Sequence, residues 1–186
     1  ERYALIKARP VTGDPGRAQE LMTTLRPFVY RRYIDFGVIE SLRGMKQMIN
    51  TEVRRRGLQD NVKLGHGGIR EVEFIAQCFQ LIRGGRDLGL QQRELLAVLD
   101  ECVELGCLPA AAVAELRAAY LFLRDSEHAI QGYQDKQSQD LPQAALPRAA
   151  MAAVMGYGEW DGYRAALESH RNVVAGHFRD LIAAPD

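Results

Sequence analysis

The chain has 186 residues, of which 47% are hydrophobic and 26% are charged, with 24 basic and 24 acidic side chains. This length is typical of one domain, or at most two small ones, and suffices to bury a core without disulfides or metals. The abundance of apolar residues excludes a disordered tail. No apolar run approaches the roughly 18–20 residues that a membrane span requires, so we expect a soluble protein that does not bind membranes.

The formal net charge of zero hides an uneven distribution. Residues 1–93 carry 17 Lys and Arg against 10 Asp and Glu, whereas residues 94–186 carry 7 against 14. Twenty of the basic residues are Arg, whose guanidinium suits bidentate contacts with phosphate or carboxylate. The basic half is therefore either a face that binds an anion or a set of Arg-rich helices with a solvated surface.

The three cysteines, Cys78, Cys102 and Cys107, lack the spacing of a zinc site. Cys78 lies in an apolar helical run and is predicted to be a small buried hydrophobic residue. Reduced cysteines and the lack of a signal peptide predict a cytoplasmic location. Because the chain begins at Glu1 in the middle of a helical pattern, we expect it to be a piece of a longer protein.

Apolar residues recur at helical spacing along almost the whole chain, and strand signals are almost absent. Pro27 is expected to kink or shorten its helix, while Pro142, Pro147 and the glycines at 156–158 are expected to break up the stretch before the last helix. The sequence predicts an all-α fold, a single bundle-like helical domain of about seven or eight helices over residues 1–186. The main helices are predicted at residues 2–9, 17–31, 35–56, 69–83, 90–105, 109–134 and 159–182.

The most distinctive segment is the turn at residues 65–68, Gly-His-Gly-Gly, in front of the helix predicted at 69–83. Three glycines in four residues suit a backbone that turns tightly or approaches another group closely. We expect the unpaired N–H groups at the start of the helix to point into the turn, where they and the helix dipole attract an anion. Lys63 and Arg70 add positive charge. The pattern predicts either a structural turn or a phosphate or carboxylate cradle, and it is neither a Walker A loop nor a dinucleotide fingerprint.

The helix after this turn carries apolar residues on two opposite faces. Phe74 and Leu81 lie opposite its main apolar face, where a surface helix would be polar. The helix is therefore expected to be covered on both sides, with Arg70, Glu73 and Gln77 partly desolvated. Such groups need partners, which either an internal salt-bridge network or a ligand supplies.

Other kinds of chemistry have little support in the sequence. Cys and Ser residues lack a nucleophile motif, and the paired aspartates of two-metal catalysis are missing. The Arg-rich stretch at 32–56 has no accompanying nucleic-acid motif, so a nucleic-acid partner is not expected. No metal site is predicted, because the four histidines lack an i, i+4 pair or a Cys/His cluster: His66, His128, His170 and His177.

Five segments carry a resemblance to a known family: residues 1–9, 25–49, 52–58, 61–91 and 119–131. Together they resemble the bacterial bifunctional glutamine synthetase adenylyltransferase/adenylyl-removing enzymes over nearly the whole chain. In that family two nucleotidyltransferase halves each combine a catalytic domain with a helical domain. The form KLGHGGIREVEF, with Arg70 and Glu71, resembles the first, adenylyl-removing half, because the second half typically has Thr-Asp at these two positions.

The resemblance implies that residues 1–186 are the helical domain of that half, and that the catalytic nucleotidyltransferase domain with its metal-binding aspartates is absent from this chain. The implied parent reaction is phosphorolysis of adenylyl-tyrosine on glutamine synthetase, which yields ADP. The other half attaches AMP from ATP, so that the enzyme controls nitrogen assimilation. Both halves would use Mg2+, with ATP, ADP and phosphate as substrates or products. The implied partners are glutamine synthetase, the PII signal protein and the upstream nucleotidyltransferase domain.

Together these arguments predict a nucleotide- or phosphate-binding site formed by Lys63, Gly65, Gly67, Gly68, Arg70, Glu71 and Glu73. The turn would face the catalytic cleft, and the two glutamates would orient the cations or contact the ribose. No catalytic residue and no metal ligand is predicted in the chain, so the isolated chain is expected to be inactive. The alternative is a non-catalytic interaction module that binds glutamine synthetase or PII, in which the turn only fixes a domain junction.

Overall fold

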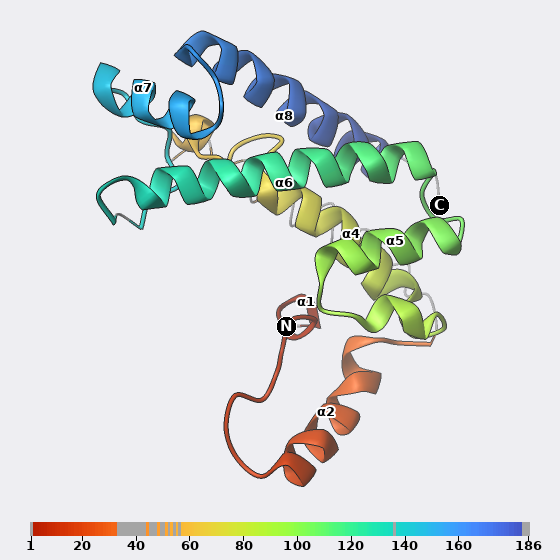
Figure 1. The fold of residues 1–186 in the computed structure, drawn as a ribbon. Helices are drawn as coiled ribbons and strands as arrows, with labels where there is room; N and C mark the ends of the chain where they lie inside the picture. The colour runs from red at the N-terminus through yellow and green to blue at the C-terminus, as the bar shows by residue number, and fades with distance from the viewer. Residues whose placement is uncertain are drawn as a thin grey trace. The chain divides into compact units, whose positions relative to one another are not determined.

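A computed structural model describes residues 2–32, 57–135 and 137–183, together with positions 44, 48, 51, 53 and 55. Within these residues the secondary structure is helical and no strand is present, which confirms the all-α prediction (Figure 1). The α-helices are α1 (Arg2–Leu5), α2 (Pro15–Val29), α4 (Ile69–Arg83), α5 (Leu95–Glu104), α6 (Ala110–Gly132), α7 (Ala145–Val154) and α8 (Trp160–Ala183). Short 3-10 helices are η1 (Leu58–Asp60), η2 (Leu88–Gln91) and η3 (Tyr133–Asp135). The helix predicted at 35–56 lies mostly outside the described residues.

The predicted helix boundaries differ from the observed ones mainly around prolines and short turns. The helix predicted at 69–83 is α4, and α2 ends two residues after Pro27. The helix predicted from residue 90 begins only at Leu95, because the preceding residues form η2. The expectation that Pro147 breaks up its segment is wrong, since Pro147 lies in the first turn of α7. There its missing N–H costs nothing, because the first N–H groups of a helix have no intrahelical acceptor.

The chain divides into two compact units. Unit 1 comprises Glu1–Gly44 and Phe74–Ala110, and unit 2 comprises Met45–Glu73 and Ala111–Asp186. Unit 1 therefore holds α1, α2, α5 and the larger part of α4, whereas unit 2 holds the start of α4 together with α6, α7 and α8. The assignment of residues 1–186 to one domain of a longer enzyme stays a prediction.

The core of unit 1 forms around α4. The Phe74 side chain is buried, and its ring centroid lies 5.9 Å from that of Tyr3 in α1. Gln80 is also buried, and its Nε2 donates to the carbonyl oxygens of Leu90 and Gln92, at 2.7 Å each. These two bonds attach η2 to α4 and satisfy a polar group that would otherwise be costly to bury. The prediction that both faces of α4 are covered is confirmed, because Phe74 and Leu81 are as buried as the residues opposite them.

In unit 2, α6 and α8 run antiparallel (Figure 1). The Tyr163 hydroxyl near the start of α8 donates to Ser126 Oγ in the second half of α6 at 3.1 Å. Near the end of α8, His177 Nε2 lies 2.7 Å from Glu115 Oε2 in the first half of α6. Burial raises the pKa of the Tyr163 phenol to about 12, whereas its hydrogen bond with Ser126 opposes the shift. These two contacts join α6 and α8 near both ends of the pair.

None of the described helices combines the length and the apolar character that a bilayer-spanning segment requires.

Candidate functional site

The glycine-rich turn at residues 65–68 packs tightly within unit 2. Gly67 has a φ of +67°, and a Cβ atom there would lie 2.1 Å from the carbonyl oxygen of Arg171 in α8. A Cβ atom on Gly65 would lie 2.5 Å from the carbonyl oxygen of Asn61, and one on Gly68 would lie 2.8 Å from three backbone carbonyl oxygens. Only glycine fits at these three positions without a shift of the backbone, which confirms the expected close approach.

The N–H groups around the start of α4 are already paired within the chain. The amides of Ile69 and Arg70 donate to the carbonyl oxygens of Val62 and Lys63, at 3.2 and 3.0 Å. The expectation of unpaired N–H groups in this turn is therefore wrong, because the preceding segment folds back and supplies acceptors that the sequence pattern does not reveal. Each of the following N–H groups has an acceptor in the chain: Gly67, Gly68, Ile69, Arg70 and Glu71.

Glu71 fixes the turn from inside the helix. It is buried, and its Oε2 accepts the N–H of Gly67 at 3.1 Å, while Oε1 lies 3.5 Å from His66 Nδ1. A glutamate in the first turn that reaches back to an amide before the helix acts as in a capping box. The structure therefore shows a capping role for Glu71.

Arg171 of α8 holds the segment that leads into the turn. It is only 5% exposed, and its two terminal nitrogens donate to the carbonyl oxygens of Gln59 and Asn61, at 3.1 and 2.7 Å. Burial lowers the pKa of Arg171, and Glu168, 3.8 Å away, opposes the shift. The Asn61 side chain adds a second attachment, since its Oδ1 accepts the amides of Lys63 and Leu64. A buried arginine paired mainly with carbonyls thus positions the turn.

Charged side chains from the segment before the turn, from α4 and from α6 form ion pairs in unit 2 and are here called the charged cluster: Lys63, Arg70, Glu73, Arg124 and Glu127. Lys63 Nζ lies 3.2 Å from one carboxylate oxygen of Glu127, and Arg124 donates to the other. Arg70 pairs with Glu73 at 3.0 Å. Glu127 is 2% exposed, so its charge needs both of its cations.

Tyr120 of α6 interacts electrostatically with both carboxylates of the charged cluster. Its pKa is raised by burial, and the carboxylates of Glu73 and Glu127 add to the shift while Arg124 opposes it. The phenol therefore lies within electrostatic range of both carboxylates. Glu73 of α4 and Glu127 of α6 both belong to unit 2.

The charged cluster presents its cations to solvent. The side chains of Lys63, Arg70 and Arg124 are 36%, 42% and 35% exposed. Ammonium and guanidinium groups that are partly exposed in this way suit an incoming phosphate or carboxylate. Both carboxylates are engaged by cations, so this donor set does not fit Mg2+, which requires oxygen ligands at close range without competing cations.

The structure divides the predicted site residues into two groups. Lys63, Arg70 and Glu73 join the charged cluster, whereas the three glycines and Glu71 build the packed turn. Of the internal salt-bridge network that is one interpretation of Arg70, Glu73 and Gln77, the structure shows the pair of Arg70 with Glu73; a ligand contact stays a prediction. Gln77 is buried, and its Oε1 has no hydrogen-bond partner among the described residues.

The sequence analysis does not predict the residues of α6 and α8 that take part in this site, namely Arg124, Glu127 and Arg171. Arg124 and Glu127 lie within residues 119–131, one of the segments that carry the family resemblance, but no local pattern marks them. For Arg171 a usable signal exists, because it follows Leu167 by four positions and precedes Val174 by three. Both of these neighbours are fully buried, so the arginine occupies the apolar stripe of its helix, where a charge requires partners.

Comparison with known proteins identifies the family. A family model described as GlnD PII-uridylyltransferase matches residues 43–182. The chain is 55% identical, over 98% of its length, to the bifunctional glutamine synthetase adenylyltransferase/adenylyl-removing enzyme of Hahella chejuensis, and 56% identical over its full length to those of Pseudomonas putida and Nitrosococcus oceani. It spans 19% of the length of each relative. The chain therefore belongs to the GlnD PII-uridylyltransferase family, and the similarity to glutamine synthetase adenylyltransferase/adenylyl-removing enzymes confirms the resemblance seen in its sequence.

Proposed function

We propose that the chain is the helical domain of an enzyme that attaches AMP to glutamine synthetase and removes it, and that it belongs to the adenylyl-removing half. The names of the relatives support the activity. The presence of Arg70 and Glu71 in the motif at residues 63–74 supports the assignment to that half. The catalytic nucleotidyltransferase domain, with Mg2+ and the residues that hold ATP or ADP, is proposed to lie elsewhere in the longer enzyme. This location of the Mg2+ site is supported by the charged cluster, because both of its carboxylates are already paired with cations.

The charged cluster is proposed to bind the phosphate that removes the adenylyl group. In phosphorolysis a phosphate oxygen forms a bond to the adenylyl phosphorus, the bond from that phosphorus to the tyrosine oxygen breaks, and ADP leaves. Both reactants are anions, so cations placed beside them reduce their repulsion and stabilise the charge of the transition state. A guanidinium has five N–H donors, which allows Arg70 to hold Glu73 and a phosphate oxygen together.

The observation that carries this proposal is that Lys63 of the motif shares the Glu127 carboxylate with Arg124 of α6, while Arg70 of the same motif pairs with Glu73. The phosphate would be bound by side chains, because the backbone N–H groups of the turn already have acceptors within the chain. A contact of Gly65, Gly67 or Gly68 with the nucleotide stays a prediction, as does a contact of Glu71 or Glu73 with the ribose.

Substitution of Arg70 in the full-length enzyme tests the proposal. Arg70→Ala is expected to lower the rate of ADP formation from adenylylated glutamine synthetase and phosphate by about a hundredfold, the loss typical of removing one charge-stabilising group. Arg179→Ala is the matched control, because Arg179 is an exposed arginine of α8 outside the charged cluster. Equal rates of ADP formation in the two variants would refute the role of Arg70.

The paired amides of the turn also favour a second candidate, a non-catalytic module that binds glutamine synthetase or PII. The name of the matching family model refers to PII and supports PII as a partner. Titration of the 186-residue chain with glutamine synthetase, with PII and with ADP separates the two candidates. Binding of a protein partner without ADP, together with an active Arg70→Ala enzyme, would favour the module.

We also propose a cytoplasmic location. Cys78, Cys102 and Cys107 are free thiols, and thiols persist in reducing compartments.

A further inference from the structure

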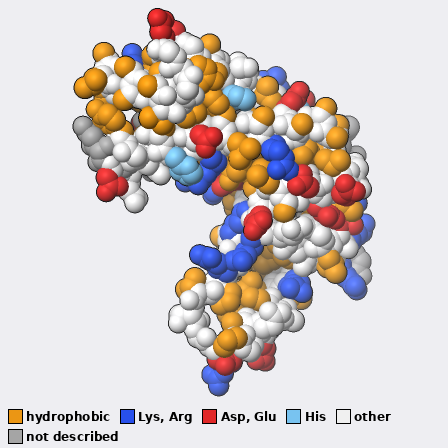
Figure 2. Space-filling model, viewed as in Figure 1, with side chains coloured by type: hydrophobic (Ala, Val, Ile, Leu, Met, Phe, Trp, Pro, Cys, Tyr) orange, Lys and Arg blue, Asp and Glu red, His pale blue; other side chains and the backbone are white. Residues whose placement is uncertain are grey.

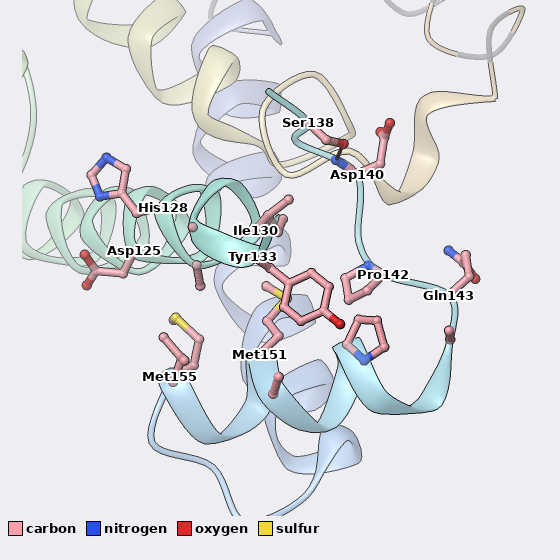
Figure 3. A pocket seen from close by; sticks show the side chains of 16 residues that line it. Asp125, His128, Ile130, Tyr133, Ser138, Asp140, Pro142, Gln143, Met151 and Met155 are labelled. Carbon is pink, nitrogen blue, oxygen red and sulfur yellow. Dashed lines mark hydrogen bonds between the residues drawn. The ribbon is translucent and has the colours of Figure 1, made fainter. Parts of the chain in front are cut away.

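The surface around α7 does not define the chemistry of a ligand. Hydrophobic side chains gather over this helix (Figure 2), and a cavity of about 900 Å3 within unit 2 is lined by it and by the end of α6 (Figure 3). Asp125 and Asp140 border the cavity, but Arg148 donates to the Pro142 carbonyl and to the Gln143 side chain of the same border. Charges of both signs therefore meet at this cavity, and they favour no single class of partner. The pair of thiols at the end of α5 is more specific.

Helix α5 ends in a Schellman motif with a cysteine at each of its two outer positions. Gly106, just past the helix, has a φ of +64°, the left-handed conformation that ends many helices. The N–H of Cys107 donates to the carbonyl oxygen of Cys102 at 2.8 Å, and the N–H of Gly106 donates to that of Val103 at 2.9 Å. In such a motif the side chains at the outer positions, here Cys102 and Cys107, ordinarily contact each other.

The hydrogen bond from Cys107 to Cys102 also limits the distance between the two cysteines. With standard bond lengths on either side of this bond, their Cα atoms are at most about 7 Å apart, and the bent angles at the carbonyl and the amide bring them closer. Disulfides join residues whose Cα atoms are about 4.4–6.8 Å apart. Arg83 Nη1 lies 2.9 Å from Cys107 Sγ, and both Arg83 and Cys107 act electrostatically on Cys102. The two sulfurs are therefore within reach of a covalent bond without a large shift of the backbone.

The two thiols differ in what can reach them. Cys107 is partly exposed, whereas Cys102 is buried. Burial raises the pKa of Cys102 to about 12, and the charge of a Cys107 thiolate adds to the shift. Oxidation of Cys107 to an uncharged sulfenic acid removes this repulsion, so that modification of the exposed thiol favours reaction of the buried one.

We propose that Cys102 and Cys107 form a redox-sensitive modification site, in which hydrogen peroxide oxidises Cys107 and Cys102 then forms a disulfide with it across the end of α5. In the first step the Cys107 thiolate attacks one peroxide oxygen, the O–O bond breaks and hydroxide leaves, which gives the sulfenic acid. In the second step the Cys102 thiolate attacks the Cys107 sulfur, the S–O bond breaks and a second hydroxide leaves. The two thiol protons convert both hydroxides to water, so the cysteines lose two electrons and the peroxide gains them.

The modification site is separate from the charged cluster. Cys102 and Cys107 belong to unit 1, whereas the charged cluster belongs to unit 2, so the inference does not depend on the proposed function. A dithiol reductant reverses such a disulfide by thiol–disulfide exchange. In a reducing compartment the disulfide is therefore transient, as redox-sensing disulfides are.

Peptide mapping of the oxidised 186-residue chain tests the inference. Arg93 and Arg117 are successive tryptic sites, so both cysteines fall in the peptide 94–117. After treatment with hydrogen peroxide, removal of the peroxide by catalase and alkylation in denaturant, this peptide is expected to carry no alkyl group and to be lighter than its reduced form by two hydrogen atoms. Dithiothreitol added before alkylation should restore two alkylated cysteines. Recovery of the peptide only with alkylated or sulfinic cysteines after oxidation would overturn the inference.

The variant Cys102→Ser separates the two steps. Dimedone traps sulfenic acids, and its attachment to Cys107 during peroxide treatment is expected to be at least about tenfold greater in Cys102→Ser than in the unchanged chain, because the second step is blocked. Cys78→Ser is the matched control, since Cys78 is also buried but lies outside the pair, and it should form the disulfide as the unchanged chain does. Equal labelling of Cys107 in Cys102→Ser and in the unchanged chain, or loss of the disulfide in Cys78→Ser, would contradict the role of Cys102. The mapping of the unchanged chain does not depend on the folding of either variant.

Discussion

Gly67 lies directly against the backbone of Arg171. Its φ is +67°, and a Cβ atom on it would come within 2.1 Å of the Arg171 carbonyl oxygen. The same arginine donates to the carbonyl oxygens of Gln59 and Asn61, so backbone and side chain of one residue fix both the turn and the segment before it. Because Lys63 lies between these contacts, the position of α8 determines where this cation of the charged cluster is placed.

Substitution of Gly67 by alanine is expected to destabilise the chain strongly. Alanine would have to adopt a left-handed backbone conformation and displace α8, at a combined cost of about 3 kcal/mol or more in the free energy of unfolding. Urea denaturation measures this cost. Gly106→Ala serves as the control, because Gly106 also has a positive φ, of +64°, but a Cβ atom there would meet no other atom within 4 Å. That control is expected to lose only about 1 kcal/mol; an equal loss in both variants would show that the contact with Arg171 is unimportant.

Removal of the Arg171 guanidinium is expected to loosen the segment before the turn. Arg171→Met removes one donor from the carbonyl oxygens of Gln59 and Asn61, and only that of Asn61 keeps another donor, the N–H of Gly65; the loss is expected to lower the free energy of unfolding by about 1–3 kcal/mol. Arg171→Lys is expected to recover only part of this loss, since an ammonium lacks the planar fork that reaches both carbonyls. The exposed control Arg179→Met should change stability by less than about 0.5 kcal/mol. If Arg171→Met and Arg179→Met unfold at the same urea concentration, the positioning role is wrong.

Local sequence pattern predicts the long helices but not the contacts between distant segments. Helices α4, α6 and α8 follow from sustained helical periodicity bounded by glycine and proline. Helix α7 is not predicted, because Pro147 indicates a break, whereas its position in the first turn makes it tolerable. The pairing of Arg171 with Asn61 joins residues 110 positions apart, and no local rule specifies such a contact. For the same reason the pattern of the turn predicts free N–H groups that the folded chain does not offer.

Acid is expected to destabilise unit 2 through His170. This ring packs against Phe122, with centroids 4.5 Å apart, and burial lowers its pKa. A histidine whose pKa is lower in the folded than in the unfolded chain takes up its proton preferentially on unfolding. The contribution of neutral His170 to the free energy of unfolding is therefore complete above a pH of about 6.5, the ordinary histidine pKa. This contribution is lost as the pH falls below that value.

The variant His170→Gln isolates this effect. The difference in the free energy of unfolding between pH 7.5 and pH 5.5 is expected to be smaller in His170→Gln than in the unchanged chain, because the other titrating groups are common to both. An identical pH dependence in the two proteins would exclude a contribution from His170.

The three thiols are expected to react at different rates. Cys78 and Cys102 are buried, and burial raises the pKa of both, that of Cys102 to about 12. Cys107 is partly exposed, with Arg83 donating to its Sγ at 2.9 Å, so a reagent in solution can reach this thiol but not the other two. Alkylation with iodoacetamide followed by mass spectrometry should therefore modify Cys107 first. A fast phase that persists in Cys107→Ser would contradict this order.

The central claim is that the charged cluster binds the phosphate used to remove AMP. The most direct test is the dependence of ADP formation on phosphate concentration in the full-length enzyme carrying Lys63→Ala and Arg70→Ala, with adenylylated glutamine synthetase as substrate. The account predicts a much higher phosphate KM in this double variant, with the Arg179→Ala control unchanged and the AMP-attaching activity retained. An unaltered phosphate KM in the double variant would contradict it.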